Sequence, residues 1–470
     1  EVELHAAAVI PLLRENAAAR ASASSRVTEA KFFSAAFMRR CSPGGLLVVV
    51  CCFALRRGAA GGGRFGYYKH SNGASDAALR GDFRSMRHIA KYVLDTAGGE
   101  RAKFMTAKTP PGLIRLDSGS PSFATPAHIV AAVKQAIDEG HTGYILEKGV
   151  MALLEAICES LHAETGATVA PAQVLITNGS SSGIYSVMSC LLDPGDEVIV
   201  FDPSYSLYAH VARQLGAVPV PVRLNAEYQL DVAAVRAAVT PRTRLVMLCN
   251  PNNPTGSVFR EADIAALLEL CAEKDLLLAA DEAYCKLMQP GQTHVPVMKF
   301  HRHLDRLILL GTFSKSYAMT GWRLGYVVAP PDLIDFIYGI HRAINGPICN
   351  FVQRAGIAAL RGPQDCIPEF NAIYHRRAAL MHRLARAIPG VHPAEPQGAF
   401  YLWTRVDLPQ SAREVRAALW ERGVAVRSGT EYGAGGEKHL RISYSVAEET
   451  IERGMAVFAE VVRELAKKTA

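Results

Sequence analysis

One lysine in the stretch GTFSKSYAMTGWRLGY, residues 311–326, stands among hydroxyl groups and ahead of an arginine. Thr312 and Ser314 precede Lys315, and Arg323 follows it. A lysine amine can attack a carbonyl carbon and later accept a proton, whereas hydroxyl groups and a guanidinium bind anions such as phosphate. Because a lone lysine is usually a solvated surface charge, the rest of the chain must supply partners before this stretch predicts a reaction.

Three other polar motifs also follow apolar runs. NGSSSG (178–183) follows QVLIT, NPNNPTG (250–256) follows RLVMLC, and Asp281 follows LLLAA. Each has an ordinary explanation, since Asn, Pro and Gly form turns, Ser caps helices and a carboxylate can end a strand in solvent. Together with the lysine stretch, however, they supply a phosphate-binding turn, a hydrogen-bond donor, a buried anion and an amine.

The apolar runs before these motifs belong to an alternation of short strands and amphipathic helices that begins near residue 170. The expected strands cover 173–177, 196–201, 217–222, 244–250, 276–280 and 306–314, and the expected helices between them cover 181–192, 231–239 and 261–275. This pattern predicts an α/β fold with a mainly parallel sheet that is covered by helices on both faces. Ligands of such sheets bind beyond the carboxyl ends of the strands, where the four motifs are expected.

The chemistry of the four motifs matches pyridoxal phosphate. Its phosphate is bound by backbone amides at a helix N-terminus, by hydroxyl groups and by a guanidinium. Its aldehyde needs an amine, its ring nitrogen an anion, and its ring oxygen neutral donors. The candidates are Gly179, Ser180, Ser181, Thr312 and Arg323 for the phosphate, Lys315 for the aldehyde, Asp281 for the ring nitrogen, and Asn253 and Tyr284 for the ring oxygen.

Composition narrows the class of protein. A length of 470 residues favours two or more domains, and 49% hydrophobic residues is typical of a globular chain. The net charge of +7 suits a small anionic ligand better than a nucleic acid. Ten cysteines without a CxxC pair indicate reduced thiols, and no apolar run reaches the roughly 18–20 residues of a membrane span. We therefore expect a cytoplasmic enzyme with no metal, nucleic-acid or membrane partner.

Residues 1–86 have a different character. Between Glu29 and Asp76 the chain has seven lysines and arginines and no acidic residue, and it contains the apolar run LLVVVCCFAL (46–55). This composition resembles a targeting segment, which would favour an organellar location. A disordered extension or a misplaced start codon would explain it as well, and we assign the segment no catalytic role.

With its motifs in this order, the sequence resembles the class I and II aminotransferases, which are fold type I enzymes of pyridoxal phosphate. The resemblance runs from about Leu116 to the C-terminus. The lysine stretch and NPNNPTG carry it, and LDSGSPSFATPAHI (116–129), PQGAFYLW (396–403) and LRISYS (440–445) support it.

The resemblance implies a mainly parallel, seven-stranded-type sheet sandwiched by helices, and a smaller α+β domain. The large cofactor-binding domain would cover 136–384, and the small domain would combine 87–135 with 385–470. Among the catalytic residues, Lys315 matches the lysine that forms a Schiff base with the cofactor. Asp281 matches the partner of the pyridinium nitrogen, and Tyr284 a donor to the ring oxygen.

The resemblance also implies five further contacts. Tyr205 matches an aromatic ring that stacks on the cofactor, and Tyr144 a tyrosine that reaches the phosphate of the neighbouring subunit. Arg441 matches the arginine that holds the substrate α-carboxylate in a bidentate fork, which a lysine could not form. Gly119 and Asn253 would complete that carboxylate site. Shared sites of this kind imply a homodimer.

The expected function is transamination, in which an amino group passes from an L-amino acid to a 2-oxo acid such as 2-oxoglutarate or pyruvate. The reaction would be ping-pong, with the cofactor bound to Lys315 as a Schiff base. No second arginine is marked for a side-chain carboxylate, so neutral or aromatic donors are favoured. Tyr205, Phe123, Tyr144 and Phe400 are candidates to line an apolar side-chain pocket.

Two alternatives remain open at this point. The same motifs would serve a β-lyase, or a cyclase such as aminocyclopropane-carboxylate synthase, because these enzymes use the same lysine and aspartate. A DNA-binding regulator with an aminotransferase-like domain is the other, since the first 86 residues are basic. Against the regulator, this segment has an apolar, Gly-rich core and no pair of amphipathic helices typical of a helix-turn-helix.

Overall fold

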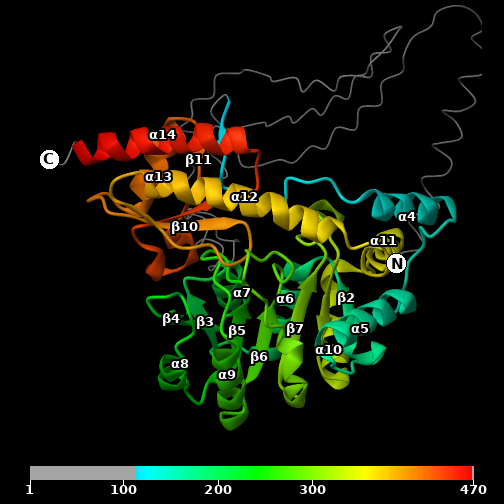
Figure 1. The fold of residues 1–470 in the computed structure, drawn as a ribbon. Coiled ribbons are helices and arrows are strands. Elements are labelled where there is room, and N and C mark those ends of the chain that lie inside the picture. Colours follow the sequence, from blue (N-terminus) through cyan, green and yellow to red (C-terminus); the bar gives the residue numbers. More distant parts are fainter. Residues whose placement is uncertain (1–108, 110–111, 468–470) are drawn as a thin grey trace, which may run out of the picture. The chain divides into compact units, whose positions relative to one another are not determined.

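The computed structural model describes residue 109 and residues 112–467. The extension predicted for residues 1–86 lies outside the described residues. Three sheets occur in the described part of the chain, with seven, four and two strands, and helices connect their strands (Figure 1).

The seven-stranded sheet has the order β2-β8-β7-β6-β5-β3-β4. Six of its strands run in the same direction, and β8, which is antiparallel to its neighbours β2 and β7, is the exception. This confirms the mainly parallel sheet predicted from the sequence, which did not predict β8. The strands are β2 (Val174–Thr177), β3 (Glu197–Asp202), β4 (Val218–Arg223), β5 (Thr243–Cys249), β6 (Leu277–Asp281), β7 (Leu307–Thr312) and β8 (Gly325–Val328).

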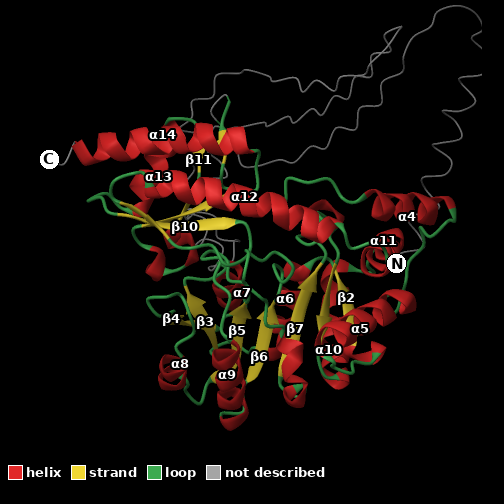
Figure 2. Ribbon diagram, viewed as in Figure 1, coloured by secondary structure: helices red, strands yellow, loops and turns green. Residues whose placement is uncertain are grey.

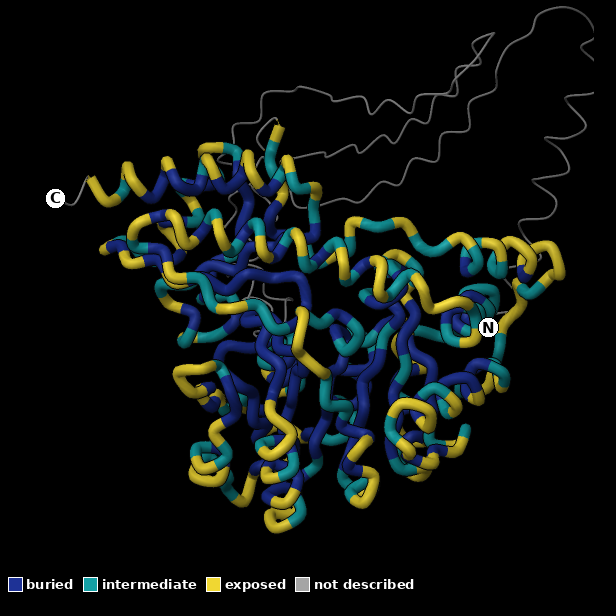
Figure 3. Tube along the Cα trace, viewed as in Figure 1, coloured by how far each residue is buried: buried dark blue, intermediate teal, exposed yellow. Residues whose placement is uncertain are grey.

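Strand β3 is buried along its whole length, and β5 and β6 are buried except at Arg244 and Leu277 near their N-terminal ends (Figure 3). Successive residues of a strand point to opposite faces, and both faces are apolar. In β5, for example, Val246 and Leu248 belong to the core on one face, and Leu245 and Met247 to the core on the other. The continuous apolar runs of the sequence are therefore explained by a sheet with helices on both faces.

The helices divide between the two faces of the large sheet. Residues of α5, α8, α9 and α11 pack into one core, and residues of α6, α7 and α10 into the other (Figure 2). The bounds are α5 (Met151–Thr165), α6 (Ser180–Leu191), α7 (Leu207–Gln214), α8 (Val232–Ala238), α9 (Glu261–Glu273), α10 (Pro331–Asn345) and α11 (Asn350–Arg361), with 3-10 turns η2 (Pro171–Gln173), η3 (Val297–His303) and η4 (Thr320–Trp322).

A separate hydrophobic core surrounds the four-stranded sheet, whose order is β12-β13-β10-β9 and whose pairs are all antiparallel. Three amphipathic helices, α12, α13 and α14, pack into this core. The bounds are β9 (Val391–Pro393), β10 (Tyr401–Val406), β12 (Arg427–Ser428), β13 (His439–Ser443), α12 (Cys366–Arg386), α13 (Ala412–Glu421) and α14 (Glu448–Lys467), with η5 (Gly429–Tyr432) and η6 (Ala434–Gly436).

The N-terminal part of the described chain contributes to both cores. Strand β1 (Ile114–Arg115) pairs in parallel with β11 (Val424–Ala425), and Val424 belongs to the core around the four-stranded sheet. Helix α4 (Ala127–Asp138) instead places Ile129 in a core of the large sheet. The domain boundaries predicted from the sequence stay a prediction. Because α4 packs on the large sheet, the predicted boundary between residues 135 and 136 would lie before this helix instead of within it.

No helix of the described residues is long and apolar enough to cross a membrane. The expectation of a cytoplasmic location, with an organellar one as the alternative, stays a prediction.

Candidate active site

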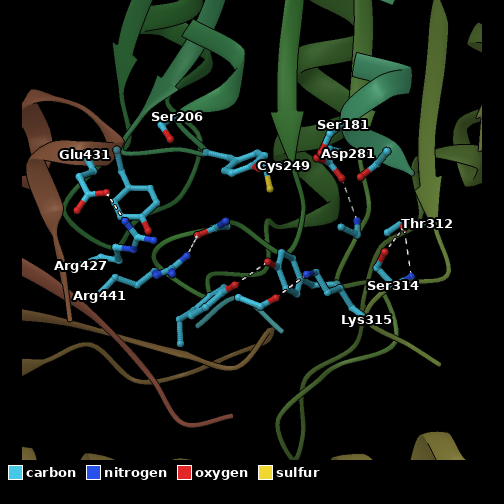
Figure 4. A pocket seen from close by; sticks show the side chains of 18 of the residues that line it. Ser181, Ser206, Cys249, Asp281, Thr312, Ser314, Lys315, Arg427, Glu431 and Arg441 are labelled. Atoms are coloured by element: carbon cyan, nitrogen blue, oxygen red, sulfur yellow. Dashed lines mark hydrogen bonds and ion pairs between the residues drawn. The ribbon is translucent and has the colours of Figure 1, made fainter. Parts of the chain in front are cut away.

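A pocket of about 230 Å³ lies where the carboxyl ends of the large-sheet strands face the four-stranded sheet (Figure 4). Most of the residues that the sequence singled out line it, although they are spread over more than 300 positions of the chain. These are Gly119, Ser180, Ser181, Tyr205, Asn253, Asp281, Tyr284, Thr312, Lys315, Arg323 and Arg441.

One end of the pocket has the features of an anion site. Helix α6 begins at Ser180, and no side chain caps its N-terminus. Gly179 has a φ of 75°, and a Cβ there would lie 2.5 Å from Arg323 Nη2, so only glycine lets the guanidinium approach this closely. Free backbone amides at a helix N-terminus beside a guanidinium are a favourable site for a phosphate.

Asp281 ends β6 and is buried. Its carboxylate accepts hydrogen bonds from the Tyr208 hydroxyl (2.8 Å) and the Ala283 amide (3.1 Å). Burial raises the pKa of Asp281 to about 6, and the hydrogen bond from Tyr208 opposes that shift. A buried carboxylate with a raised pKa gains most from a cationic partner, and a protonated ring nitrogen would be one.

Lys315 follows β7 and reaches into the same pocket. Its Nζ donates a hydrogen bond to the Gly119 carbonyl (2.5 Å) and lies 5.9 Å from the centre of the Tyr284 ring. Burial, assisted by the positive charge of Arg441, lowers the pKa of Lys315 to about 8. The amine is therefore neutral, and able to act as nucleophile or base, over a wider pH range than a surface lysine.

Arg441 lies opposite, on β13, and is buried. Its Nη1 donates to Asn253 Oδ1 (3.0 Å) and its Nη2 to the Asp117 carbonyl (2.9 Å). The guanidinium carbon lies 4.0 Å from the centre of the Tyr401 ring and 5.2 Å from that of Tyr432. Among the described residues its Nε is buried without a hydrogen-bond partner, so the group has a donor left for a ligand.

Tyr284 is also buried in the pocket wall, where its hydroxyl shares a hydrogen bond with the Tyr401 hydroxyl (2.8 Å). Because Asn253 accepts from Arg441 through Oδ1, its Nδ2 is the donor end of that side chain. Both residues thus have donors in the pocket, and their roles towards a ring oxygen stay a prediction.

The sequence interpretation missed several pocket residues. It gave no role to Tyr401 and Arg427, which line the pocket, or to Tyr208, which donates a hydrogen bond to Asp281. Tyr208 lies in α7, whereas Tyr205 precedes that helix, so helical spacing does not mark the contact of Tyr208 with Asp281. The further residues of the pocket that were not predicted are Asp117, Ser206, Cys249, Ala283, Glu431 and Tyr432.

Three of the four predicted pocket aromatics, Phe123, Phe400 and Tyr144, do not line the pocket. Phe123 stacks on Phe370 with ring centroids 4.2 Å apart, and Phe400 is fully buried against Tyr284. Both belong to the core around the four-stranded sheet, because a fully apolar ring gains more from that core than from a polar site. Neither lines the pocket.

Arg427 corrects a second expectation, since the sequence marked no further arginine for the substrate side chain. The structure places its guanidinium in the pocket wall, near Glu431. Tyr144 lies outside the pocket and is 86% exposed.

Comparison with known proteins agrees with this geometry. The sequence pattern described as "Aminotransferase class I and II" matches residues 111–458. The chain belongs to this family. It is an aminotransferase, and its cofactor is pyridoxal phosphate, on which the members of the family depend.

Three similar proteins each match about three quarters of this aminotransferase. It is 33% identical over 361 residues to an aspartate aminotransferase of Pyrococcus horikoshii. This match covers 76% of this chain and 92% of that protein. It is 34% identical over 364 residues to an arginine–pyruvate transaminase of Pseudomonas aeruginosa, and this match covers 76% of this chain and 89% of that protein. A crystal structure of an aromatic aminotransferase from Pyrococcus horikoshii matches with a TM-score of 0.73 at 31% identity, over 75% of this chain and 96% of that one.

The residues of this aminotransferase fit the cofactor. The uncapped start of α6 and Arg323 suit its phosphate, and the buried Asp281 carboxylate suits its protonated ring nitrogen. The Lys315 amine, with its lowered pKa, suits its aldehyde.

Proposed function

We propose that this aminotransferase moves the amino group of an L-amino acid with a neutral or aromatic side chain to a 2-oxo acid such as pyruvate or 2-oxoglutarate, in a ping-pong reaction at Lys315. The observation that carries the proposal is the meeting of three groups in one pocket. Lys315 and Asp281 come from the large sheet and Arg441 from the four-stranded sheet.

In this proposal Arg441 orients the substrate. Its guanidinium is held by Asn253 and the Asp117 carbonyl, between the rings of Tyr401 and Tyr432. A guanidinium fixed in this way binds a carboxylate with two parallel hydrogen bonds and little loss of entropy. The α-carbon next to that carboxylate is then presented to Lys315, whose Nζ lies beside the Gly119 carbonyl.

Lys315 first anchors the cofactor and then, once the substrate has displaced it, moves the proton of the α-carbon. A base works best when its pKa is near the pH of operation, and burial brings the pKa of Lys315 to about 8. When bound, pyridoxal phosphate supplies an electron sink for the pair left at the α-carbon. Asp281 holds the proton on the ring nitrogen, since its buried carboxylate is stabilised by that positive charge.

The pocket wall supports the preference for neutral donors. Four tyrosines line it, and these rings are apolar on their faces and donate hydrogen bonds at one edge. They are Tyr205, Tyr284, Tyr401 and Tyr432.

The test is the half-reaction with an amino acid alone. The holoenzyme is mixed with L-alanine, L-methionine, L-phenylalanine or L-aspartate, without a 2-oxo acid, and the visible band of the cofactor is followed. A transaminase converts to a stable amine form of the cofactor and releases one 2-oxo acid per site. Release of ammonia, or a preference for aspartate over the three neutral donors, would contradict the proposal.

We further propose that two chains share their sites, with Tyr144 of each completing the phosphate site of the other. Its exposed side chain lies outside the pocket of its own chain, and Leu146 and Met151, which follow it in the chain, are exposed and apolar, as at a subunit interface. Mixing Lys315→Ala with Tyr144→Ala chains should restore one intact site per heterodimer. A fully active monomer in sedimentation, or no recovery from two variants that are each impaired, would contradict the shared site.

A further inference from the structure

An ion pair that the mechanism does not use lies in the wall of the pocket. Arg427 on β12 and Glu431 in η5 are four residues apart, and Arg427 Nη1 lies 3.2 Å from Glu431 Oε2. Their side chains are only 19% and 9% exposed. The other carboxylate oxygen of Glu431 accepts a hydrogen bond from the Ser428 amide (3.3 Å), which fixes the acid in place.

This pair lies next to the proposed carboxylate site. Arg427 and Arg441 are directly opposite each other in the β12–β13 pairing, so two guanidinium groups come from adjacent positions. A second acid, Asp117, lies 3.8 Å from Arg427 Nη2, but it is already bound by Arg115 at 2.7 Å and 3.0 Å. Glu431 is therefore the acid that balances the charge of Arg427.

The pair also faces the space that a substrate side chain would enter. Figure 4 shows Arg427, Glu431 and Arg441 on one side of the pocket and Thr312, Ser314 and Lys315 on the other. Glu431 and Tyr432 also line a neighbouring cavity of about 370 Å³, together with Tyr205 and Ser206. Glu431 thus stands where the pocket meets this second cavity.

We propose that the Arg427–Glu431 pair determines donor specificity by closing the side-chain subsite to charged side chains of either sign. The inference rests on the proposed function, which it deepens. A second carboxylate on the substrate can bind Arg427 only by displacing Glu431, and a cationic group can bind Glu431 only by displacing Arg427. Either exchange leaves a largely buried charge without its partner, which is costly, whereas a neutral side chain leaves the pair intact.

One consequence concerns the amino acceptor. Pyruvate has no second carboxylate, and 2-oxoglutarate has one that would compete with Glu431. The pair therefore selects pyruvate over 2-oxoglutarate as well as neutral over acidic donors.

The experiment compares the holoenzyme with Glu431→Gln, Arg427→Gln and the double variant, each an uncharged replacement of similar shape. The second-order rate constant of the half-reaction is measured with L-aspartate, L-arginine and L-alanine, and the two ratios to alanine are compared. Glu431→Gln should raise the aspartate-to-alanine ratio about tenfold or more, because Arg427 is then available to a carboxylate. Arg427→Gln should raise the arginine-to-alanine ratio by a similar factor. The double variant should raise neither the aspartate-to-alanine nor the arginine-to-alanine ratio.

Glu159→Gln is the matched control, because Glu159 pairs with Arg361 at 2.7 Å on the exposed surface, away from the pocket. It should leave both ratios unchanged. The inference is overturned if the ratios of the single variants stay as in the unmodified enzyme, or if the unmodified enzyme already uses aspartate or arginine as well as alanine. A holoenzyme that does not react with alanine, methionine or phenylalanine would instead overturn the proposed function itself.

Discussion

The two walls of the pocket are built in different ways. The large-sheet wall includes Asp281 and Thr312 at the carboxyl ends of strands, Lys315 in the turn after β7, and Ser180 and Ser181 at the start of α6. The small-sheet wall consists of Tyr401, Arg427, Glu431, Tyr432 and Arg441, which lie on strands of the four-stranded sheet or in η5 beside them.

This difference shows why one wall is easier to find than the other. Each residue of the large-sheet wall stands in a short polar motif after an apolar run, so its position at the edge of a parallel sheet follows from the local sequence. Residues of the small-sheet wall come from strands that meet by antiparallel pairing, such as Trp403 with Arg441 and Arg427 with Arg441. Their proximity depends on the register in which the strands pair, and no short sequence motif predicts that register. If the walls also differ in function, changes in the large-sheet wall should affect all donors alike.

The largest effect should follow from Lys315→Ala in the large-sheet wall. Without the amine, the cofactor has no covalent anchor and the α-proton no base, so turnover should fall at least about a thousandfold with every donor. The visible absorbance of the bound cofactor should change as well. Lys299→Ala, which removes an exposed lysine paired with Glu261, is the control and should retain activity. Near-normal turnover of Lys315→Ala would rule out the assignment.

A smaller but uniform effect is expected from Arg441→Lys in the small-sheet wall. A lysine keeps the charge but cannot form the bidentate fork, so kcat/KM should fall about a hundredfold. The loss should be the same for alanine, methionine and phenylalanine, because all three present the same α-carboxylate. Arg422→Lys alters a surface pair with Glu464 and serves as the control. A loss confined to one donor would place Arg441 in the side-chain subsite instead.

The pH dependence of cofactor attachment tests whether the two walls are coupled by charge. Only the neutral amine attacks an aldehyde, and the pKa of Lys315 is lowered to about 8, so the attachment rate should rise about tenfold per pH unit below 8 and level off above it. Stopped-flow absorbance of the cofactor-free chain with pyridoxal phosphate, from pH 7 to 10, measures this. Because the charge of Arg441 helps to lower that pKa, Arg441→Gln should move the inflection to higher pH. An inflection near that of a surface lysine would contradict the burial argument.

The smallest effect should follow from Tyr208→Phe, behind the large-sheet wall. The hydroxyl donates to Asp281 and favours its charged form, so its loss should raise the pKa of that carboxyl above about 6. A hydrogen bond of about 1 kcal/mol corresponds to roughly a fivefold fall in kcat near neutral pH, with the acid limb of the pH profile shifted upward. Tyr317→Phe removes a hydroxyl bonded to Gln364, outside the pocket, and should leave the profile in place. An unchanged acid limb in Tyr208→Phe would mean that this hydrogen bond does not tune Asp281.

The sequence by itself determined the large sheet and the identity of most residues along its edge. Continuous apolar runs such as RLILLG can be buried on both faces only in a covered, mainly parallel sheet, and a polar residue directly after such a run must lie at its carboxyl end. Asp281 and Lys315 therefore followed from local pattern. Arg441 was found through its family motif, LRISYS, and not through any local physical signal.

Tertiary structure alone decided which further groups line the pocket or contact the residues that line it. Tyr208 reaches Asp281 because α7 packs against the sheet, across 73 positions of the chain. Arg427 reaches the pocket because β12 pairs with β13, and there it forms an ion pair with Glu431, four residues further along the chain. Phe123 and Phe400, which were predicted to line the pocket, instead pack in the core around the four-stranded sheet. The reason is similar, because apolar area is buried wherever the packing of distant elements provides room. Such contacts depend on register and packing between elements, which the local sequence does not encode.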